Sequence, residues 1–382
     1  MDLSVAVTPL YLGTMAAERA LQRRRAERSG PGYAPGAGDY TRADTTTSLG
    51  MGVLSLTTPI TAFLVGRAVP FRTGRRGTLG GRIGMTVLGI SVASAAATTV
   101  ADRIAAHADT SSVSGRRARR RARRVDEIGG VVAVATSGVV VAATSAFVTN
   151  TSRLWATGRQ RDLGNGVAPW TIGMIGWDLG YYWNHRLMHE VRALWAIHVP
   201  HHSSERYNLS TALRQPVASA FGAWLPYSVM ALFGVRPFII ETSRALNLIY
   251  QYWVHTEMIG SLGPAESVLS TPSHHRVHHG SNRRYLDRNH GGILIVWDRL
   301  FGTFQRELPD HGPVVYGLTR NVNSHNLLTV STHEYREIFR DVSRSTTWRD
   351  RLGFVLRGPG WATRRRAELD ATTHGQLVRH AA

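Results

Sequence analysis

The sequence predicts an all-α protein, an integral membrane bundle of helices that carries a helical cap on one side. Three observations lead to this fold class. Several apolar stretches approach the roughly 20 residues that a helix needs to cross a bilayer. Short arginine runs separate these stretches, which is typical of loops beside a membrane. Histidines at helical spacing follow the ends of the apolar stretches and indicate helices outside the bilayer.

The apolar stretches set the expected membrane helices. Four of them, almost free of charge, cover residues 49–71, 83–101, 128–150 and 167–183. Their Gly, Ala, Ser and Thr residues suit close helix packing within a membrane. We expect residues 3–17 to form a short helix that enters the membrane, and residues 218–254 to form a re-entrant hairpin. A soluble protein with buried Ala-rich helices is the alternative, which a mean hydropathy of −0.15 favours, but four such stretches are hard to bury in a soluble fold.

The chain is strongly basic, with a formal charge of +19, and all 45 basic residues are Arg. Such a charge can indicate a nucleic-acid partner. Here, however, much of it lies in runs at residues 23–25 and 116–124, between apolar stretches. We therefore expect membrane lipids and no nucleic acid as partners. The bias towards Arg, Ala and Gly is typical of a GC-rich bacterial genome, so the bacterial cell membrane is the expected location. The absence of Cys excludes disulfides and thiolate ligands.

Loop charge predicts the orientation in the membrane. Residues 19–42 contain six Arg and residues 102–127 contain eight, and both loops share one side if residues 3–17 cross. Positive loops tend to stay in the cytoplasm, although the opposite loop at 72–82 carries four Arg. With this parity, the helix that ends at Trp183 brings His185 to the cytoplasmic face. The hairpin returns the chain to the same face at His255, so the cap is expected to be cytoplasmic.

The histidines are the strongest functional signal, because eleven of 17 lie between His185 and His290. Their spacings of three and four residues place several rings on one helix face. So many imidazoles packed together without a metal would be costly to desolvate. Imidazole suits Zn, Cu, Fe and Ni, and eight or nine ligands exceed what one ion takes. The pattern therefore predicts a site for two metal ions.

Three classes of protein compete at this point. A zinc hydrolase typically uses three protein ligands and a carboxylate base. A metal transporter or sensor would place its acidic or histidine residues within membrane spans, whereas these clusters follow the span ends. Two ions in a nitrogen-rich shell at a membrane face indicate iron and the activation of O2. A membrane zinc-dependent hydrolase and a metal-binding membrane protein remain the alternatives.

The histidine segments resemble those of a known family. Residues 185–189, 198–202 and 275–279 are similar to the H-x3-H, H-x2-H-H and H-x2-H-H boxes of the fatty acid hydroxylase/sterol desaturase superfamily. Four longer strings look closer to its alkylglycerol monooxygenase branch: HHSSERYNLSTALRQ, YQYWVHTE, TPSHHRVHHG and GGILIVWDRLFGTF. The resemblance is densest over roughly residues 170–305.

The resemblance implies a membrane-bound di-iron oxygenase that uses O2 to hydroxylate or otherwise oxidise a C–H bond of a fatty acyl, sterol or ether lipid. It implies two iron ions, and it assigns no catalytic residue beyond the metal ligands. These ligands are nine histidines: His185, His189, His198, His201, His202, His255, His275, His278 and His279. No pterin motif supports the tetrahydrobiopterin associated with the alkylglycerol branch. No nucleotide fingerprint or cytochrome-like module is visible, so we expect a separate electron donor.

The same resemblance gives the expected domains and some secondary roles. Residues 1–168 would hold the N-terminal transmembrane helices, 169–308 the catalytic domain and 309–382 a cytoplasmic extension. Where the family has Asn-Tyr-Gly after the third box, this chain has Asn289-His290-Gly291. Carboxylates that could support ligand rings, with a structural or solvated charge as the alternative, are Glu190, Glu205, Glu257 and Asp298. Asn208 and Arg214 could orient a pocket or headgroup. Three aromatic residues could line a lipid channel, with a place at the membrane interface as the alternative: Tyr182, Trp183 and Trp253.

Overall fold

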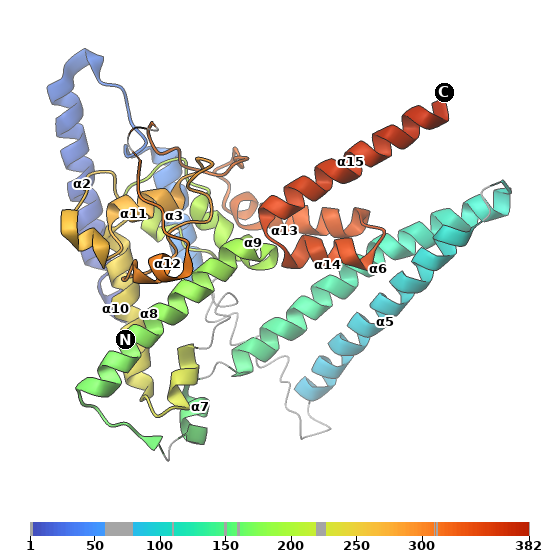
Figure 1. The fold of residues 1–382 in the computed structure, drawn as a ribbon, viewed down its shortest axis with the longest axis horizontal. Helices are drawn as coiled ribbons and strands as arrows, with labels where there is room; N and C mark the ends of the chain where they lie inside the picture. Colours follow the sequence, from blue (N-terminus) through green and yellow to red (C-terminus); the bar gives the residue numbers. More distant parts are fainter. Residues whose placement is uncertain are drawn as a thin grey trace. The chain divides into compact units, whose positions relative to one another are not determined.

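The computed structural model describes residues 3–57, 79–108, 111–148, 151–158, 161–218, 227–308, 310 and 312–381. Within these residues the regular elements are all helices (Figure 1). Extended pairing in the described part is limited to a single bridge between Leu269 and Leu294. The predicted all-α class is thus confirmed, while the membrane bundle with a cytoplasmic cap stays a prediction.

The chain forms two compact units that are interleaved along the sequence. The first comprises Met1–Pro59, Val148–Leu187 and Ile197–Ser331, and the second comprises Ile60–Phe147, Met188–Ala196 and Thr332–Ala382. The three successive domains expected from the sequence concern roles rather than contacts and stay a prediction. The helices that lie in or continue into the first unit are α1 (Leu3–Ala6), α2 (Thr8–Ser29), α3 (Arg42–Ser55), α7 (Thr151–Gly158), α8 (Val167–Glu190), α9 (Arg192–His202), α10 (Pro237–Trp253), α11 (Pro272–His279) and α12 (Val296–Phe301). Short 3-10 turns in this unit are η1 (Gly30–Gly32), η3 (Thr211–Leu213), η5 (Tyr227–Ala231) and η6 (Gly263–Ser267).

Helix α8 packs closely against α10 and η5 in the first unit. Its glycines at 173, 176 and 180 lie on one face, because positions three and four apart are neighbours on a helix. A Cβ at Gly173 would lie 2.6 Å from Ile239 of α10, and one at Gly176 would lie 2.7 Å from Met230 of η5. The small-residue face therefore lets α10 and η5 approach closely. The core beside it contains Trp177, Ala231, Val235, Ile239 and Ile240.

A buried carboxylate of α8 joins three segments. Asp178 accepts hydrogen bonds from Asn247 Nδ2 of α10 at 2.6 Å and from the backbone N–H of Ile293 at 2.8 Å. Its second oxygen accepts from Trp297 Nε1 at 2.9 Å. Because an unpaired buried carboxylate is costly, these contacts fix α8, α10 and residues 293–297 relative to one another.

The N-terminal helix packs into the first unit. The predicted helix at residues 3–17 is found as α1 and α2, and α2 continues to Ser29. Tyr11 stacks on Tyr252 of α10 with ring centroids 4.0 Å apart. Glu18 is buried and accepts hydrogen bonds from Tyr40 Oη at 2.5 Å and from the backbone N–H of Leu209 at 2.9 Å. One face of α2 is therefore occupied by protein contacts.

The second unit contains α5 (Leu79–His107), α6 (Val113–Val148), α14 (Trp348–Leu356), α15 (Pro359–Ala381) and most of α13 (Leu327–Arg344). Ser91 of α5 lies 2.7 Å from Ser137 of α6 between their hydroxyl oxygens, so the two helices lie side by side (Figure 1). The buried Arg351 of α14 pairs with Asp126 of α6 and, at 3.1 Å, with Asp102 of α5. Asp102 and Asp126, which were expected in the loop at residues 102–127, thus lie on helices and hold this unit together.

One helix of the described residues is long and apolar enough to cross a membrane, and it covers Thr86–His107 within α5. It overlaps the predicted span at 83–101. The predicted spans at 128–150 and 167–183 fall largely on the helices α6 and α8. The predicted span at 49–71 begins in α3, but its residues 58–71 lie outside the described part, as do residues 219–226 of the predicted hairpin.

Candidate metal centre

The structure gathers the nine predicted ligand histidines into two buried groups. Within each group the nitrogen atoms that could bind a metal lie within 4.8 Å of one another. The first group consists of His185, His189, His198, His202 and His278. The second group consists of His201, His255, His275 and His279. Their roles as ligands stay a prediction, but their convergence is a property of the fold.

The three histidine boxes do not correspond one to one to the groups. In the second box, His198 and His202 belong to the first group and His201 to the second. In the third box, His275 and His279 belong to the second group, whereas His278 belongs to the first. Successive residues of an α-helix are rotated by about 100°. Positions i and i+4 therefore point in similar directions, while i+3 and i+4 diverge enough to reach two different ions.

The first group is centred on His198 of α9. Its Nε2 lies 3.0 Å from Nε2 of His185 on α8 and 3.0 Å from Nε2 of His202. The boundary between the two compact units falls within α8, between His185 and His189. His189 nevertheless follows His185 by one turn of the same unbroken helix. Its place in this group is therefore set by the helix itself.

The second group is centred on His255, which lies two residues after the end of α10. Its Nε2 lies 3.2 Å from Nε2 of His201 and 3.0 Å from Nε2 of His275. Nε2 of His279 is buried and has no hydrogen-bond partner among the described residues. Two ligands of one ion lie roughly 3 to 3.5 Å apart when metal–nitrogen bonds are about 2.1 Å. The observed separations match that range.

The tautomers of these rings show why a cation fits between them. Nδ1 of His201 lies 3.3 Å from the carbonyl oxygen of Arg214, and Nδ1 of His255 lies 2.7 Å from that of Gln251. A carbonyl only accepts, so each Nδ1 carries the proton and each Nε2 of a neutral ring has a bare lone pair. The two lone pairs then face each other at 3.2 Å. A bound metal ion turns this repulsion into two bonds, so the donor set fits a metal.

Burial also keeps these rings in the form that binds metal. Burial lowers the pKa of His255 to about 4. It lowers the pKa of His201 and of His279 as well, and the neighbouring imidazoles lower both further. Neutral imidazole is the ligand form. The rings are therefore ready to bind a metal at neutral pH.

Backbone carbonyls orient the rings of the candidate ligands. Besides the contacts of His201 and His255, Nδ1 of His185 donates to the carbonyl of His290 at 2.9 Å. Nδ1 of His278 donates to the carbonyl of Arg288 at 2.9 Å. Among the four carboxylates considered from the sequence, Asp298 reaches a ligand ring indirectly, through the segment that contains His290.

Residues 289–291 form a loop whose shape explains its sequence. Asn289 has a positive φ of 56°, a conformation that Asn tolerates better than most residues. Asp298 is fully buried and accepts hydrogen bonds from the backbone N–H groups of His290 and Gly291, each at 2.7 Å. A Cβ on Gly291 would lie 2.5 Å from the carbonyl oxygen of Leu294. Asn, Gly and Asp thus hold the carbonyl that orients His185.

Arg214 and Asn208 make buried contacts within the first unit, and their expected role towards a pocket or headgroup stays a prediction. The guanidinium of Arg214 forms a buried ion pair with Asp44 of α3 and donates to Ser48 Oγ at 3.2 Å. This pair fixes the carbonyl of Arg214, which orients His201. Asn208 donates through Nδ2 to the carbonyl of Gly38 at 3.1 Å. Removing one partner of a buried ion pair typically costs about 3–5 kcal/mol, so Asp44 supports the second group from a distance.

An aromatic pair closes one side of the second group. The ring of Tyr207 lies 5.3 Å from that of His279 and stacks on Tyr316 at 4.6 Å. Tyr316 donates its hydroxyl proton to the carboxylate of Glu257. Glu257 is therefore engaged with a tyrosine. Tyr182 stacks on Phe301 at 5.3 Å, with its hydroxyl 2.9 Å from that of Thr303, so it is a packing residue of the wall beside the first group.

Sequence reasoning missed three buried acids that position the site: Glu18, Asp44 and Asp178. Glu18 and Asp44 lie more than 140 positions before His185, whereas Asp178 lies seven positions before it. The one available signal was an acidic residue inside an otherwise apolar stretch, as at Asp178 in the predicted span 167–183. A charge in such a stretch must find a partner inside the protein.

His290 lies beside the first group but is not one of its members. Its ring is fully buried, and its centroid lies 5.7 Å from those of His185 and His278. His290 supports the first group through its backbone, because its carbonyl orients His185 and its N–H donates to Asp298. These two backbone contacts do not depend on the side chain.

We expect His290→Tyr to retain its metal and much of its activity, since both backbone contacts survive and the main cost is overpacking of about 1–3 kcal/mol. Metal analysis and lipid oxidation by the purified variant measure this. If the folded variant loses half its metal, His290 must be counted as a ligand and the assignment of His255 reopened.

An all-helical scaffold with two buried histidine groups is typical of histidine-rich metal-binding proteins, and known proteins show what this chain is similar to. Residues 170–303 match the Fatty acid hydroxylase family model. This segment, which contains every histidine of the two groups, therefore matches the fatty acid hydroxylase domain, as the resemblance predicted.

Known relatives carry the comparison further. The chain is 46% identical over 196 residues to Alkylglycerol monooxygenase of Homo sapiens, covering 51% of this chain and 43% of that protein. It is 30% identical over 134 residues to Ornithine lipid hydroxylase OlsE of Rhizobium tropici, covering 35% of this chain and 40% of that protein. It is 29% identical over 136 residues to Delta(7)-sterol 5(6)-desaturase erg3B of Aspergillus fumigatus, covering 34% and 37%. The matches thus span less than half of each relative's length. No solved structure matches the chain.

Proposed function

We propose that this protein is a membrane-bound di-iron oxygenase that uses O2 to hydroxylate or otherwise oxidise a C–H bond of a lipid. The observation that carries the proposal is the pair of buried histidine groups, in which bare imidazole nitrogens face one another at metal-ligand separations. The fatty acid hydroxylase domain and the relatives named for lipid hydroxylation, monooxygenation and desaturation support the lipid substrate.

The metal ions and the protein's own residues have different roles. Two irons would be held by the five and four histidines of the two groups, and when bound they would supply the activation of O2. The protein's own residues hold the rings in one tautomer, through the carbonyls of His290, Arg214, Gln251 and Arg288. The buried walls of both groups exclude water, which protects a strong oxidant from side reactions. A separate electron donor completes the reaction.

A membrane zinc-dependent hydrolase is the second candidate. Its requirement is a carboxylate base beside the metal. Glu257 is engaged with Tyr316, and Asp298 is occupied by two backbone N–H groups and Thr303. Both carboxylates are engaged by these contacts and are poorly placed to act as a base for a metal-bound water. Donor sets made only of histidines therefore favour redox chemistry over hydrolysis.

We expect the purified protein to contain about two irons per chain, because nine imidazoles divide into one group for each ion. Metal analysis measures the stoichiometry, and lipid products formed under 18O2 should carry the label. An active preparation with one zinc and no iron would overturn the di-iron assignment and favour the hydrolase.

We also propose that the metal centre faces the cytoplasm of a bacterial cell, because the Arg-rich run at residues 116–124 follows the positive-inside tendency. The chain has no cysteine, so an introduced cysteine is the only thiol that a labelling reagent can reach on this protein. Gly115→Cys and Ser281→Cys should both resist a membrane-impermeant thiol reagent in intact cells and react after permeabilisation. Reaction of Ser281→Cys from outside would contradict this orientation.

A further inference from the structure

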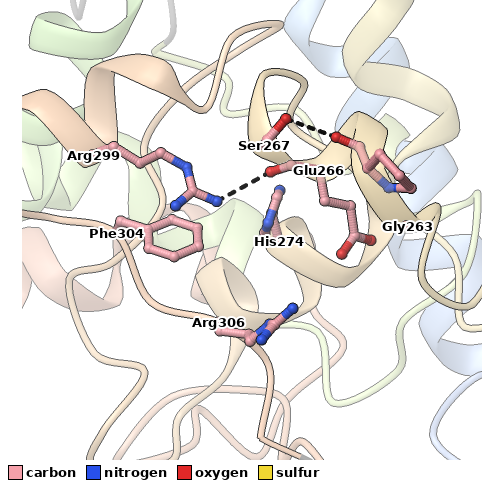
Figure 2. Close-up of a pocket in the computed structure, with 8 residues that line it drawn as sticks. Gly263, Glu266, Ser267, His274, Arg299, Phe304 and Arg306 are labelled. Carbon is pink, nitrogen blue, oxygen red and sulfur yellow. Dashed lines mark hydrogen bonds between the residues drawn. The ribbon is translucent and has the colours of Figure 1, made fainter.

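A pocket with several charged side chains in its lining lies beside α11, apart from the two histidine groups. It has a volume of about 440 Å³, within the roughly 300–1,000 Å³ of small-molecule pockets. Figure 2 shows the side chains of Arg299, His274 and Arg306 around it, together with Glu266 and Phe304. His274 precedes the ligand candidate His275 in the chain but belongs to neither metal group. Nothing in the oxidation chemistry uses these residues.

The two arginines make the pocket a site for an anion. The guanidinium of Arg299 lies 3.8 Å from the centroid of the Phe304 ring and donates to the carbonyl of Glu266 at 3.2 Å. These contacts hold it in one place and leave its other N–H groups for a ligand. The guanidinium of Arg306 has no hydrogen bond or ion pair with the residues that the structure describes. A planar guanidinium matches the geometry of phosphate or carboxylate oxygens.

Glu266 opposes this charge only in part. Its Oε1 accepts hydrogen bonds from the backbone N–H of Leu262 at 3.0 Å and from Thr271 Oγ1 at 3.1 Å. The carboxylate therefore already has two donors of its own. Two guanidinium groups face this single carboxylate, so the lining stays positive.

His274 narrows the class of anion. The residue is 2% exposed, and its Nδ1 is buried without a hydrogen-bond partner among the described residues. A ligand that fills the pocket must satisfy this nitrogen whether or not it carries a proton. An ionised carboxylate only accepts hydrogen bonds. A phosphate monoester or hydrogen phosphate has oxygens that accept and a hydroxyl that donates, so it matches either state.

We propose that the pocket formed by His274, Arg299 and Arg306 binds a phosphate monoester group, either as free phosphate or as the headgroup of a lipid such as phosphatidate. The site lies on the helix that carries three of the metal-binding candidates, yet its ligand contacts involve none of them. The proposal therefore stands independently of the oxygenase function.

The test measures binding to the purified full chain in detergent by titration calorimetry with inorganic phosphate. We expect saturable binding that Arg306→Gln and Arg299→Gln each weaken by about tenfold or more, as the loss of a charge-assisted hydrogen bond predicts. Arg283→Gln is the matched control, because Arg283 is exposed and does not line the pocket. Arg306 is exposed as well, so its variant should fold normally. An unchanged metal content would show that the two histidine groups of the variant are intact.

A second arm separates the two sources of phosphate. The chain is placed in nanodiscs of phosphatidylcholine with or without phosphatidate, and retention of the labelled monoester lipid is measured. Binding of phosphatidate alone, lost in Arg306→Gln, supports the headgroup form, and binding of inorganic phosphate supports the free form. The proposal is overturned if neither ligand binds, if Arg283→Gln weakens binding equally, or if acetate competes as well as phosphate.

Discussion

His279→Ala should lose metal from the second histidine group and with it the oxidation of lipid. Its Nε2 is buried and lacks any hydrogen-bond partner among the described residues, while its ring lies 4.6 Å from that of His201 and 4.8 Å from that of His275. Losing a group that only supports a ligand costs 10–100-fold in metal affinity. We expect the loss of this ring to exceed about 100-fold, measured as metal per chain and as oxidised lipid.

His325→Ala is the matched control for this substitution. His325 lies in the same unit and is exposed, and its contact in the structure is made by its backbone carbonyl, which accepts from Thr47 Oγ1 at 3.2 Å. It should keep both metals. Circular dichroism should show unchanged helix content in both variants. A folded His279→Ala protein that retains its full metal content would remove His279 from the ligand set.

Asp298→Ala should destabilise the protein and release metal from the first group. The carboxylate accepts from the backbone N–H groups of His290 and Gly291 and from Thr303 Oγ1, each at 2.7 Å. Each buried donor left unsatisfied costs about 1–3 kcal/mol, so we expect a loss of at least about 3 kcal/mol. The displaced carbonyl of His290 no longer orients His185, and metal affinity should fall about 10–100-fold.

Thermal unfolding of the metal-free protein and metal analysis separate these two effects. Asp298→Asn keeps one acceptor oxygen, but its side-chain NH2 group would face a backbone N–H donor. Its losses of stability and of metal affinity should therefore be intermediate. Glu241→Ala provides the control, because Glu241 is an exposed carboxylate of α10 that pairs with Arg244, and such pairs contribute at most about 1 kcal/mol. Equal losses in Asp298→Ala and Glu241→Ala would show that Asp298 does not organise the site.

The sequence by itself determined the all-α class and the set of histidines that converge. Both follow from local geometry. Spacings of three and four residues between histidines fix the angles between rings on one helix. The relative ring directions within the boxes at 185–189, 198–202 and 275–279 therefore follow from the sequence. The Asn-x-Gly at 289–291 is similarly local, because Asn289 adopts a positive φ and Gly291 has no room for a Cβ.

Only the tertiary structure decided which histidines share a group and what holds them there. His201 leaves its box neighbours to join His255, and His278 joins the group of His185, because rings 100° apart on one helix meet different neighbouring segments. Asp44 reaches residues that flank η3, Asp178 reaches α10, and Asp298 reaches the loop at 289–291. Such contacts join residues up to 170 positions apart. Spacing along one helix cannot encode them, since they depend on which buried donors the packing of other helices brings to each carboxylate.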